Sequence, residues 1–256
     1  MDANNRSKII AVSGKGGVGK TSLAAVIVKL LVASFPGKKI LAIDADPAVG
    51  LSTALGIEPE KTVDDVRKEA ITAAGEGKNA VVEVLGNAEY SIEEAMIKGN
   101  GFTFIAIGRP EAAGCYCKIN TYLKDVISAL SAHFDYVVID GEAGIEQVNR
   151  RVMEKVTHLL LVSDQSKKGR QVVETIKHVA DELVMYEKIG IIANRLSEEA
   201  MASDLSFGDI PVLAKIPFDG KLSEYDLKGE NVFFIPDDSP IVLGAKEALT
   251  KIGILF

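Results

Sequence analysis

The chemistry of this chain starts from its only two thiols, Cys115 and Cys117, which stand one residue apart in the segment GCYC. A helix candidate begins directly after them, and a thiol at a helix N-terminus has a lowered pKa that favours metal binding. Three interpretations stay open: two small buried side chains, a redox dithiol, or part of a metal site. One CxC offers two ligands where Zn²⁺ usually takes four, and a two-fold dimer would supply the second pair.

A glycine-rich segment, SGKGGVGKTS at residues 13–22, fits the P-loop pattern and stands between a strand-like run and a helix candidate. Its backbone N–H groups and the following helix N-terminus can surround phosphate oxygens. We expect Lys20 to contact the β- and γ-phosphates of a nucleotide and the Thr21 hydroxyl to bind Mg²⁺. The other residues expected to contact the nucleotide here are Gly14, Gly16, Gly17, Val18, Gly19 and Ser22.

Two aspartates end apolar strand-like runs, Asp44 in KILAID and Asp140 in YVVID. In an open parallel sheet both would lie at the carboxyl ends of strands, where ligands bind. An aspartate after an apolar strand is the usual Walker B residue, so we expect Asp140 to help hold Mg²⁺ through water. Asp44 is the weaker candidate, for Mg²⁺ or for support of the loop that follows it.

These residues are spaced along an alternation of short apolar runs and amphipathic segments. The apolar runs carry Ile, Val and Leu on consecutive positions, which is typical of strands buried on both faces of a parallel sheet. We predict an α/β fold, a doubly wound, mostly parallel sheet flanked by helices, in one domain over residues 1–256. Residues 56–100 are less regular and predict a partly helical excursion on the rim. The predicted strands are 8–13, 39–44, 102–108, 136–140, 158–163, 188–194 and 212–217, and the predicted helices are 20–34, 118–132, 146–155, 169–186 and 239–252.

Composition narrows the function classes. With 47% hydrophobic residues the chain can bury a large core, and its net charge of -7 argues against binding nucleic acid through bulk positive charge. No apolar run reaches the roughly 18 residues of a membrane span, and the N-terminus lacks the pattern of a signal peptide. Two cysteines do not make a disulfide scaffold. We therefore expect a cytoplasmic protein with no nucleic-acid partner and no stable membrane association.

Several charged and apolar clusters have plainer interpretations. The basic clusters KKGR (167–170) and NRR (149–151) are interpreted as solvated helix faces. The amphipathic C-terminal segment SPIVLGAKEALTKIGILF is interpreted as core packing and not as a surface anchor. The histidines show no ligand spacing with the cysteines, so we expect structural roles for His133, His158 and His178.

The form KGGVGKT, with a second lysine at Lys15, resembles the deviant Walker A motif of the SIMIBI-class ATPases, which include MinD, ParA and the nitrogenase iron protein. The resemblance implies a P-loop ATPase that forms a homodimer, with Lys15 reaching the nucleotide of the partner subunit. It also implies that DADP is switch I, in which Asp46 orients the attacking water. DGEAG at 140–144 then resembles switch II, with Gly141 and Gly144 as its flexible points.

Two further segments resemble the base-binding side of that family. Asn194 and Arg195 follow the run KIGIIA, at the place of the family's adenine-binding strand end, and an asparagine amide can read a base edge. The segment IPFD (216–219) matches the family's second adenine-side loop, which implicates Pro217 and Asp219. No NKxD-like guanine motif is present, so ATP and ADP are favoured over guanine nucleotides.

GCYC within this framework resembles the CooC-type maturation factors for carbon monoxide dehydrogenase and their acetyl-CoA synthase counterpart. The likeness spans nearly the whole chain, through SGKGGVGKTS, DADP, GCYC, DGEAGIE, ANR and IPFD. It implies that Cys115 and Cys117 bind Ni²⁺ or Zn²⁺ at the dimer interface while ATP turnover supports nickel insertion into the client enzyme. Gly50 departs from the polar residue that related sequences often carry after DP.

Two alternatives stand beside this hypothesis. Four thiolates on a dimer axis could hold a [4Fe–4S] cluster, although the CxC spacing favours a single ion. The chain could also be a positioning ATPase of the MinD or ParA kind, a switch that binds membrane or DNA.

Overall fold

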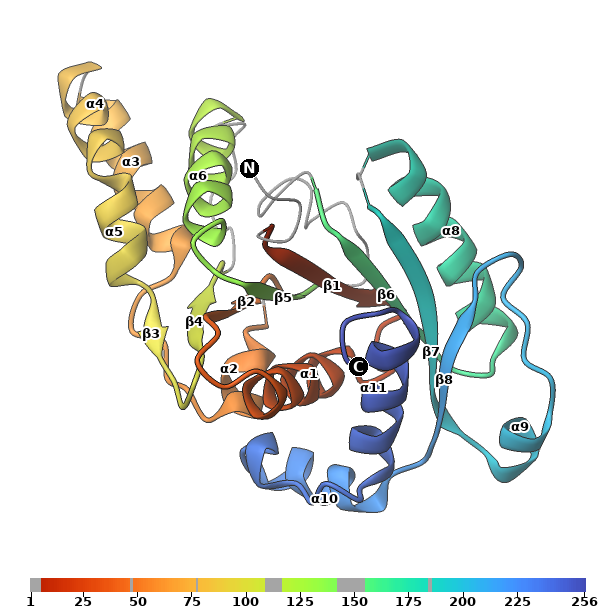
Figure 1. Cartoon of the computed structure of the whole chain (residues 1–256). Coiled ribbons are helices and arrows are strands. Elements are labelled where there is room, and N and C mark those ends of the chain that lie inside the picture. The colour runs from red at the N-terminus through yellow and green to blue at the C-terminus, as the bar shows by residue number, and fades with distance from the viewer. Residues whose placement is uncertain (1–5, 47, 77, 109–116, 142–154, 184–185) are drawn as a thin grey trace.

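The computed structural model describes residues 6–46, 48–76, 78–108, 117–141, 155–183 and 186–256 (Figure 1). One eight-stranded sheet lies at its centre, in the order β3-β4-β2-β5-β1-β6-β7-β8. The described strand pairs are parallel except for β3, which runs antiparallel to β4. The predicted doubly wound, mostly parallel sheet is therefore confirmed. The strands are β1 Lys8–Gly14, β2 Ile40–Asp44, β3 Ile97–Lys98, β4 Thr103–Ala106, β5 Tyr136–Asp140, β6 His158–Ser163, β7 Lys188–Leu196 and β8 Val212–Pro217.

The central strands are apolar on both faces because helices cover both sides of the sheet. Every residue of β2 and β5 is buried. In the register, Val138 of β5 lies between Ile10 of β1 and Ala42 of β2. The consecutive branched residues that predicted buried strands therefore fill two cores, one on each side of the sheet.

The hydrogen-bond ladder reaches the carboxyl ends of β2, β4 and β5. Asp44 and Asp140 are register partners on neighbouring strands. The N–H of Ala45 donates to the carbonyl of Asp140 at 3.0 Å, and the N–H of Ile107 donates to the carbonyl of Asp44 at 2.8 Å. The segments that follow these three strands consequently leave the sheet from neighbouring rungs of one edge.

The described helices form two layers. Side chains of α1, α2, α10, α11 and the 3₁₀ turn η1 join the core on one face, and those of α3, α5, α6, α8 and α9 join the core on the other. Figure 1 shows α1 and α11 below the sheet and α6 and α8 above it. The bounds are α1 Lys20–Ser34, α2 Gly50–Leu55, α3 Val63–Glu76, α4 Lys78–Gly86, α5 Ala88–Glu94, α6 Cys117–Ser131, α8 Lys167–Leu183, α9 Glu198–Ala202, α10 Gly220–Lys228, η1 Val232–Phe234 and α11 Pro240–Lys251.

Most predicted elements agree with the observed ones within two or three residues, and α1 agrees fully. The predicted helix 146–155 lies outside the described residues except for its last position. Residues 56–100 hold α3, α4, α5 and the short β3, which confirms the partly helical interpretation. Figure 1 shows these elements at the β3 edge of the sheet, and α3 and α5 contact α6. The single domain over 1–256 stays a prediction.

Two surface interpretations are also confirmed where the chain is described. Lys167 and Lys168 are exposed at the start of α8, whereas the cluster at 149–151 lies outside the described residues. In the C-terminal segment, Ile241 and Leu249 of α11 are fully buried, so this amphipathic helix packs on the core. No helix in the described ranges is long and apolar enough to cross a membrane.

Candidate nucleotide-binding site

The P-loop runs between the end of β1 at Gly14 and the start of α1 at Lys20. Gly17 and Gly19 have φ angles of 78° and 87°, a left-handed conformation that costs glycine little and other residues much. A Cβ on Gly14 would lie 2.0 Å from the carbonyl oxygen of Val162 on β6. The loop therefore needs glycine for its backbone shape and for its close approach to the neighbouring strand.

The loop borders a cavity of about 370 Å³, a size typical of ligand clefts. Its lining combines the P-loop with the DADP segment after β2 and the end of β7. Seven residues predicted to act on the nucleotide meet here: Gly16, Gly17, Gly19, Lys20, Thr21, Asp46 and Arg195. The other predicted site residues in the described part of the chain lie outside this lining: Gly14, Lys15, Val18, Ser22, Asp140, Asn194, Pro217 and Asp219.

The end of β7 fixes the shape of the P-loop. Asn194 is 2% exposed, and its Nδ2 donates to the carbonyl of Val18 at 2.8 Å. Nη1 of Arg195 donates to the carbonyl of Gly17 at 2.8 Å, and Arg195 itself has a φ of 58°, which is uncommon outside glycine. In this structure the two side chains hold phosphate-loop carbonyls, and their contact with adenine stays a prediction.

Asp219 is buried, and its carboxylate accepts backbone N–H groups at the starts of two helices. Its carboxylate accepts the N–H of Leu222 at 3.0 Å as the N-cap of α10, and the N–H of Ile241 at 3.3 Å near the start of α11. It also accepts the hydroxyl of Ser239. The sequence interpretation missed this capping role, for which Asp219 directly before a helix is the signal. An adenine contact by Asp219, or by Pro217 at the end of β8, stays a prediction.

Asp44 and Asp140 are fully buried, yet they are satisfied differently. Asp44 accepts the N–H of Asp46 at 3.1 Å and that of Leu51 at 2.9 Å, so it supports the DADP loop and α2. Burial raises the pKa of Asp44 to about 6, against the opposing effect of these hydrogen bonds. This outcome favours loop support over the other role considered for Asp44.

Neither carboxylate oxygen of Asp140 has a partner with hydrogen-bond geometry in the described part of the chain. Burial raises its pKa to about 7, while the neighbouring Thr21 hydroxyl and the charge of Lys20 act to lower it. A buried carboxylate without a partner is costly, and a cation beside it would offset that cost. Oxygen ligands from a carboxylate and a hydroxyl suit Mg²⁺, so these residues fit the predicted magnesium site.

Lys15, the second lysine of the P-loop, pairs with a carboxylate of its own chain. Nζ of Lys15 lies 2.6 Å from Oδ2 of Asp164 and 3.4 Å from Oγ of Ser166, and Asp164 also accepts the N–H of Ser166 at 3.1 Å. Burial acts to raise the pKa of Asp164, but the hydrogen bonds from Lys15 and Ser166 outweigh it and lower the pKa. The sequence interpretation missed Asp164, whose signal is another aspartate directly after a buried strand, β6.

Lys20 and Gly50 complete the loop's surroundings. Lys20 is only 8% exposed, and its Nζ donates to the carbonyl of Lys15 at 3.2 Å. A Cβ on Gly50, the first residue of α2, would lie 3.4 Å from Cγ2 of Thr21. The departure from a polar residue at Gly50 therefore keeps side-chain bulk away from the threonine expected to bind Mg²⁺.

The predicted metal ligands fall mostly beyond what the structure describes. Cys115, the side chain of Cys117 and residue Gly144 of the predicted switch II lie outside the described residues. Cys117 is the first residue of α6, as expected for a thiol at a helix start. Within the described ranges, no three His, Cys, Asp or Glu side chains gather as a metal site.

The histidines have structural or solvated positions. His158 is buried, and its Nδ1 lies 2.7 Å from Oγ1 of Thr157. Burial, helped by the charges of Lys188 and Lys8, lowers its pKa to about 4, so the ring is neutral at pH 7. His133 and His178 are exposed. A structural role is confirmed for His158.

Comparison with known proteins gives one matching family model. The model described as the CobQ/CobB/MinD/ParA nucleotide binding domain matches residues 9–232. In solved structures, the septum site-determining protein MinD complexed with Mg-ADP from Pyrococcus horikoshii is similar with a TM-score of 0.68 and 22% identity, covering 96% of each chain. This likeness agrees with the doubly wound fold.

Three curated relatives span most of this chain. An uncharacterized ATP-binding protein of Methanocaldococcus jannaschii is 35% identical, covering 95% of this chain and 98% of its own. The carbon monoxide dehydrogenase accessory protein CooC of Rhodospirillum rubrum is 26% identical, covering 86% and 87%. The septum site-determining protein MinD of Synechocystis is also 26% identical, covering 93% and 79%.

Proposed function

Because the chain belongs to the CobQ/CobB/MinD/ParA nucleotide-binding family and is a P-loop ATPase, we propose that its ATP turnover serves nickel insertion into carbon monoxide dehydrogenase or acetyl-CoA synthase. One observation supports the proposal: α6 begins at Cys117, so one thiol of the CxC segment belongs to a helix start, where thiolate is favoured. The relation to CooC supports the same function.

The nucleotide is proposed to bind in the 370 Å³ cavity, with its phosphates between the P-loop amides and Lys20. Thr21 and Asp140 are proposed to hold Mg²⁺, which when bound neutralises phosphate charge and orients the terminal phosphate. Asp46 lines the cavity, and we assign it the orientation of the attacking water. Its backbone is fixed by Asp44, so the carboxylate is presented from a supported loop.

Lys15 is proposed to reach the nucleotide of the partner subunit in a homodimer. In the single chain its ammonium group is neutralised by Asp164 at 2.6 Å, and both side chains are about a quarter exposed. Dimerisation would then exchange this internal ion pair for one with the partner's phosphates. A partly exposed pair contributes about 1 kcal/mol or less, which is a small barrier to that exchange.

Metal and nucleotide are proposed to act on the same dimer. Cys115 and Cys117 of two subunits would give four thiolates for one Ni²⁺ or Zn²⁺ ion. If ATP favours the closed dimer and closure tightens metal binding, metal must tighten ATP binding by the same factor, because linkage is reciprocal. Hydrolysis would reopen the dimer and release nickel to the client enzyme.

The test is native mass measurement and metal titration of the protein with Ni²⁺ or Zn²⁺ in the presence of ATP or ADP. We expect one ion per two chains, and loss of that ion in Cys115→Ser and in Cys117→Ser. Lys246→Ser, an exposed lysine of α11, is a control that should keep the ion. Equal high-affinity metal binding by the wild type and both cysteine variants would reject the site and leave the ATPase assignment intact.

A second candidate function is a positioning switch of the MinD or ParA kind. The relation to MinD, at the same identity as that to CooC, favours it, together with the exposed Lys167 and Lys168. Sedimentation with anionic liposomes or with DNA, in ATP and in ADP, distinguishes the two functions. ATP-dependent pelleting that Ni²⁺ and Zn²⁺ do not change would support the switch over the metal chaperone.

A further inference from the structure

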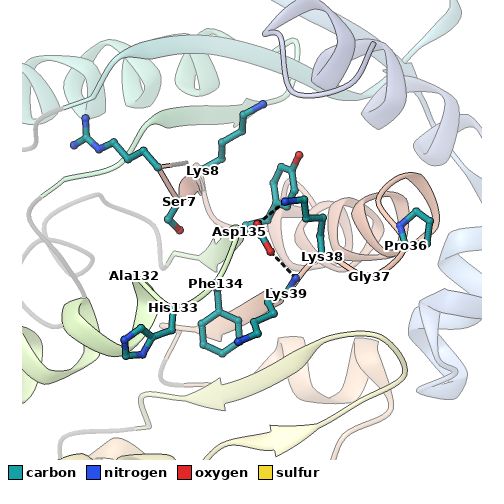
Figure 2. Close-up of a pocket in the computed structure, with 12 residues that line it drawn as sticks. Ser7, Lys8, Pro36, Gly37, Lys38, Lys39, Ala132, His133, Phe134 and Asp135 are labelled. Carbon is teal, nitrogen blue, oxygen red and sulfur yellow. Dashed lines mark hydrogen bonds and ion pairs between the residues drawn. The ribbon is translucent and has the colours of Figure 1, made fainter. Parts of the chain in front are cut away.

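A second cavity, of about 520 Å³, lies at the opposite ends of the strands that carry the nucleotide site (Figure 2). Three segments line it: residues 6–8 entering β1, residues 36–39 between α1 and β2, and residues 132–136 between α6 and β5. Because β1, β2 and β5 are parallel, these segments gather at the amino-terminal edge of the sheet. The cavity is thus separate from the P-loop.

The lining is basic in a chain whose net charge is -7. It contains Arg6, Lys8, Lys38 and Lys39, against one carboxylate, that of Asp135. Such a local reversal of sign concentrates anions near the cavity at low ionic strength.

Asp135 organises the centre of this lining. Its carboxylate accepts the N–H of Lys39 and the ammonium group of Lys38, each at 2.8 Å, and Figure 2 shows both interactions. Its own N–H donates to the carbonyl of Lys39 at 2.9 Å. The hydrogen bond from Lys38 lowers the pKa of Asp135, so the carboxylate stays ionised and is already paired. The turn before β2 and the turn before β5 are therefore fixed to each other.

The remaining positive charge belongs mainly to Lys8 and Lys39. Arg6 is already paired with Glu187 at 3.1 Å. Nζ of Lys8 lies over two aromatic rings, 5.8 Å from the centroid of Tyr136 and 5.9 Å from that of Phe256, and the part of the chain that is described gives it no anionic partner. Likewise Nζ of Lys39 makes no ion pair there. Figure 2 shows these two side chains extending from two different segments and in different directions.

We propose that this cavity binds a small polyanion with at least two phosphate or carboxylate groups, recognised by the ammonium groups of Lys8 and Lys39. Several negative charges are needed because the two lysines stand on different segments, and their flexible stems let both ammonium groups turn to one ligand. The volume suits a small molecule. His133 lies on the same lining and can add a donor. This site goes beyond the proposed ATPase and nickel functions.

Calorimetric titration of the whole protein with inorganic pyrophosphate, and separately with citrate, tests the site. Saturating Mg-ADP is present throughout, so that the P-loop is not the binding site measured. We expect one pyrophosphate or citrate per chain in the wild type. Lys8→Gln and Lys39→Gln should each weaken the binding at least about threefold, and the double variant at least about tenfold, because each removes one ammonium contact.

Two further variants test whether the charges of this lining decide the affinity. Lys246→Gln removes the same charge from the exposed face of α11 and should change the affinity less than twofold. Asp135→Asn removes the single acid of the lining and should tighten the binding. The proposal is overturned if neither anion binds saturably with Mg-ADP present, or if Lys246→Gln weakens binding as much as the double variant does. Thermal unfolding of each variant verifies that the chain is folded.

Discussion

The two aspartates at opposite ends of β5, Asp140 at its carboxyl end and Asp135 directly before its amino end, differ in whether the protein pairs their carboxylates. At the carboxyl ends, Asp140 is fully buried without a partner in the described ranges, and its pKa is raised to about 7. At the amino ends, Asp135 accepts two hydrogen bonds and its pKa is lowered. These aspartates are only five residues apart in the chain.

We interpret this difference as one between a carboxylate proposed to bind Mg²⁺ and a structural carboxylate. Each carboxylate oxygen of Asp135 accepts a hydrogen bond from the protein, so its charge is paired without a ligand. The ionised carboxylate of Asp140 is destabilised because it is buried without a partner in the described ranges. Such perturbed groups are common at ligand-binding sites. Four experiments test this difference and the loops around it.

The largest effect is expected for ATP hydrolysis. Asp140→Asn should lower the rate of phosphate release by about 10²–10³-fold, because the carboxylate proposed to hold Mg²⁺ loses its charge. Asp135→Asn makes the same chemical change at the other edge and should leave hydrolysis within about twofold. Equal losses in the two variants would contradict the division between functional and structural acids.

Two glycines of the P-loop differ in the space around them: Gly14 lies against the backbone of β6, and Gly16 faces open space. Gly14→Ala should destabilise the protein by about 2–3 kcal/mol, because the new Cβ would lie 2.0 Å from a backbone oxygen of β6. Gly16→Ala should cost less than about 1 kcal/mol, since nothing lies within 4 Å of its Cβ position. Chemical denaturation of the nucleotide-free protein measures both. A similar loss in the two variants would show that close approach is not what requires glycine at Gly14.

Substitution of the two aspartates should shift the melting temperature at pH 8 in opposite directions. A raised pKa at Asp140 contributes stability at low pH that is lost as the pH rises from about 4 to about 7. Asp140→Asn should therefore raise the melting temperature of the nucleotide-free protein at pH 8 and change it little at pH 4. The lowered pKa of Asp135 contributes stability at neutral pH, so Asp135→Asn should lower the melting temperature at pH 8. This second difference should shrink as the pH falls below the usual aspartate range. Shifts of the same sign at pH 8 would refute the comparison.

The smallest effect concerns the ion pair of Lys15. Asp164→Asn should release the lysine and increase ATP-dependent dimer formation by up to about fivefold, as expected for a partly exposed pair. Asp181→Asn breaks the 2.8 Å pair with Lys177 on α8 and serves as the control. Analytical ultracentrifugation with a slowly hydrolysed ATP analogue measures both. A weaker dimer in Asp164→Asn would instead make this pair a support of the P-loop.

The carboxyl edge was largely predictable from the sequence because its signals are local. The glycine pattern, the lysine at its end and the aspartates that end two of the apolar runs identify Lys20, Asp44 and Asp140 without knowledge of strand order. The strands themselves follow from consecutive branched residues, which only burial on both faces explains.

The ion pairs, the helix cap and the basic cavity depend on contacts between segments that are distant in the sequence, and composition and spacing do not predict such contacts. Asp164 and Lys15 are 149 positions apart in the chain, and Asp135 joins a turn almost a hundred positions away. The capping role of Asp219 depends in part on Ile241, which belongs to a different helix. The basic cavity needs three turns that only the strand order brings together.

The backbone hydrogen bonds that join the carboxyl ends of β2, β4 and β5 have one more consequence. Ile107, directly after β4, is bonded to the carbonyl of Asp44, and Ala45, directly after β2, is bonded to the carbonyl of Asp140, so the described ends of β2, β4 and β5 share one short line of backbone. A displacement of the backbone after Asp44 on the proposed hydrolysis would act on Ile107 through its hydrogen bond to the carbonyl of Asp44. Under the proposed function, nucleotide and metal would then be coupled through neighbouring strand ends, without a long relay through the protein.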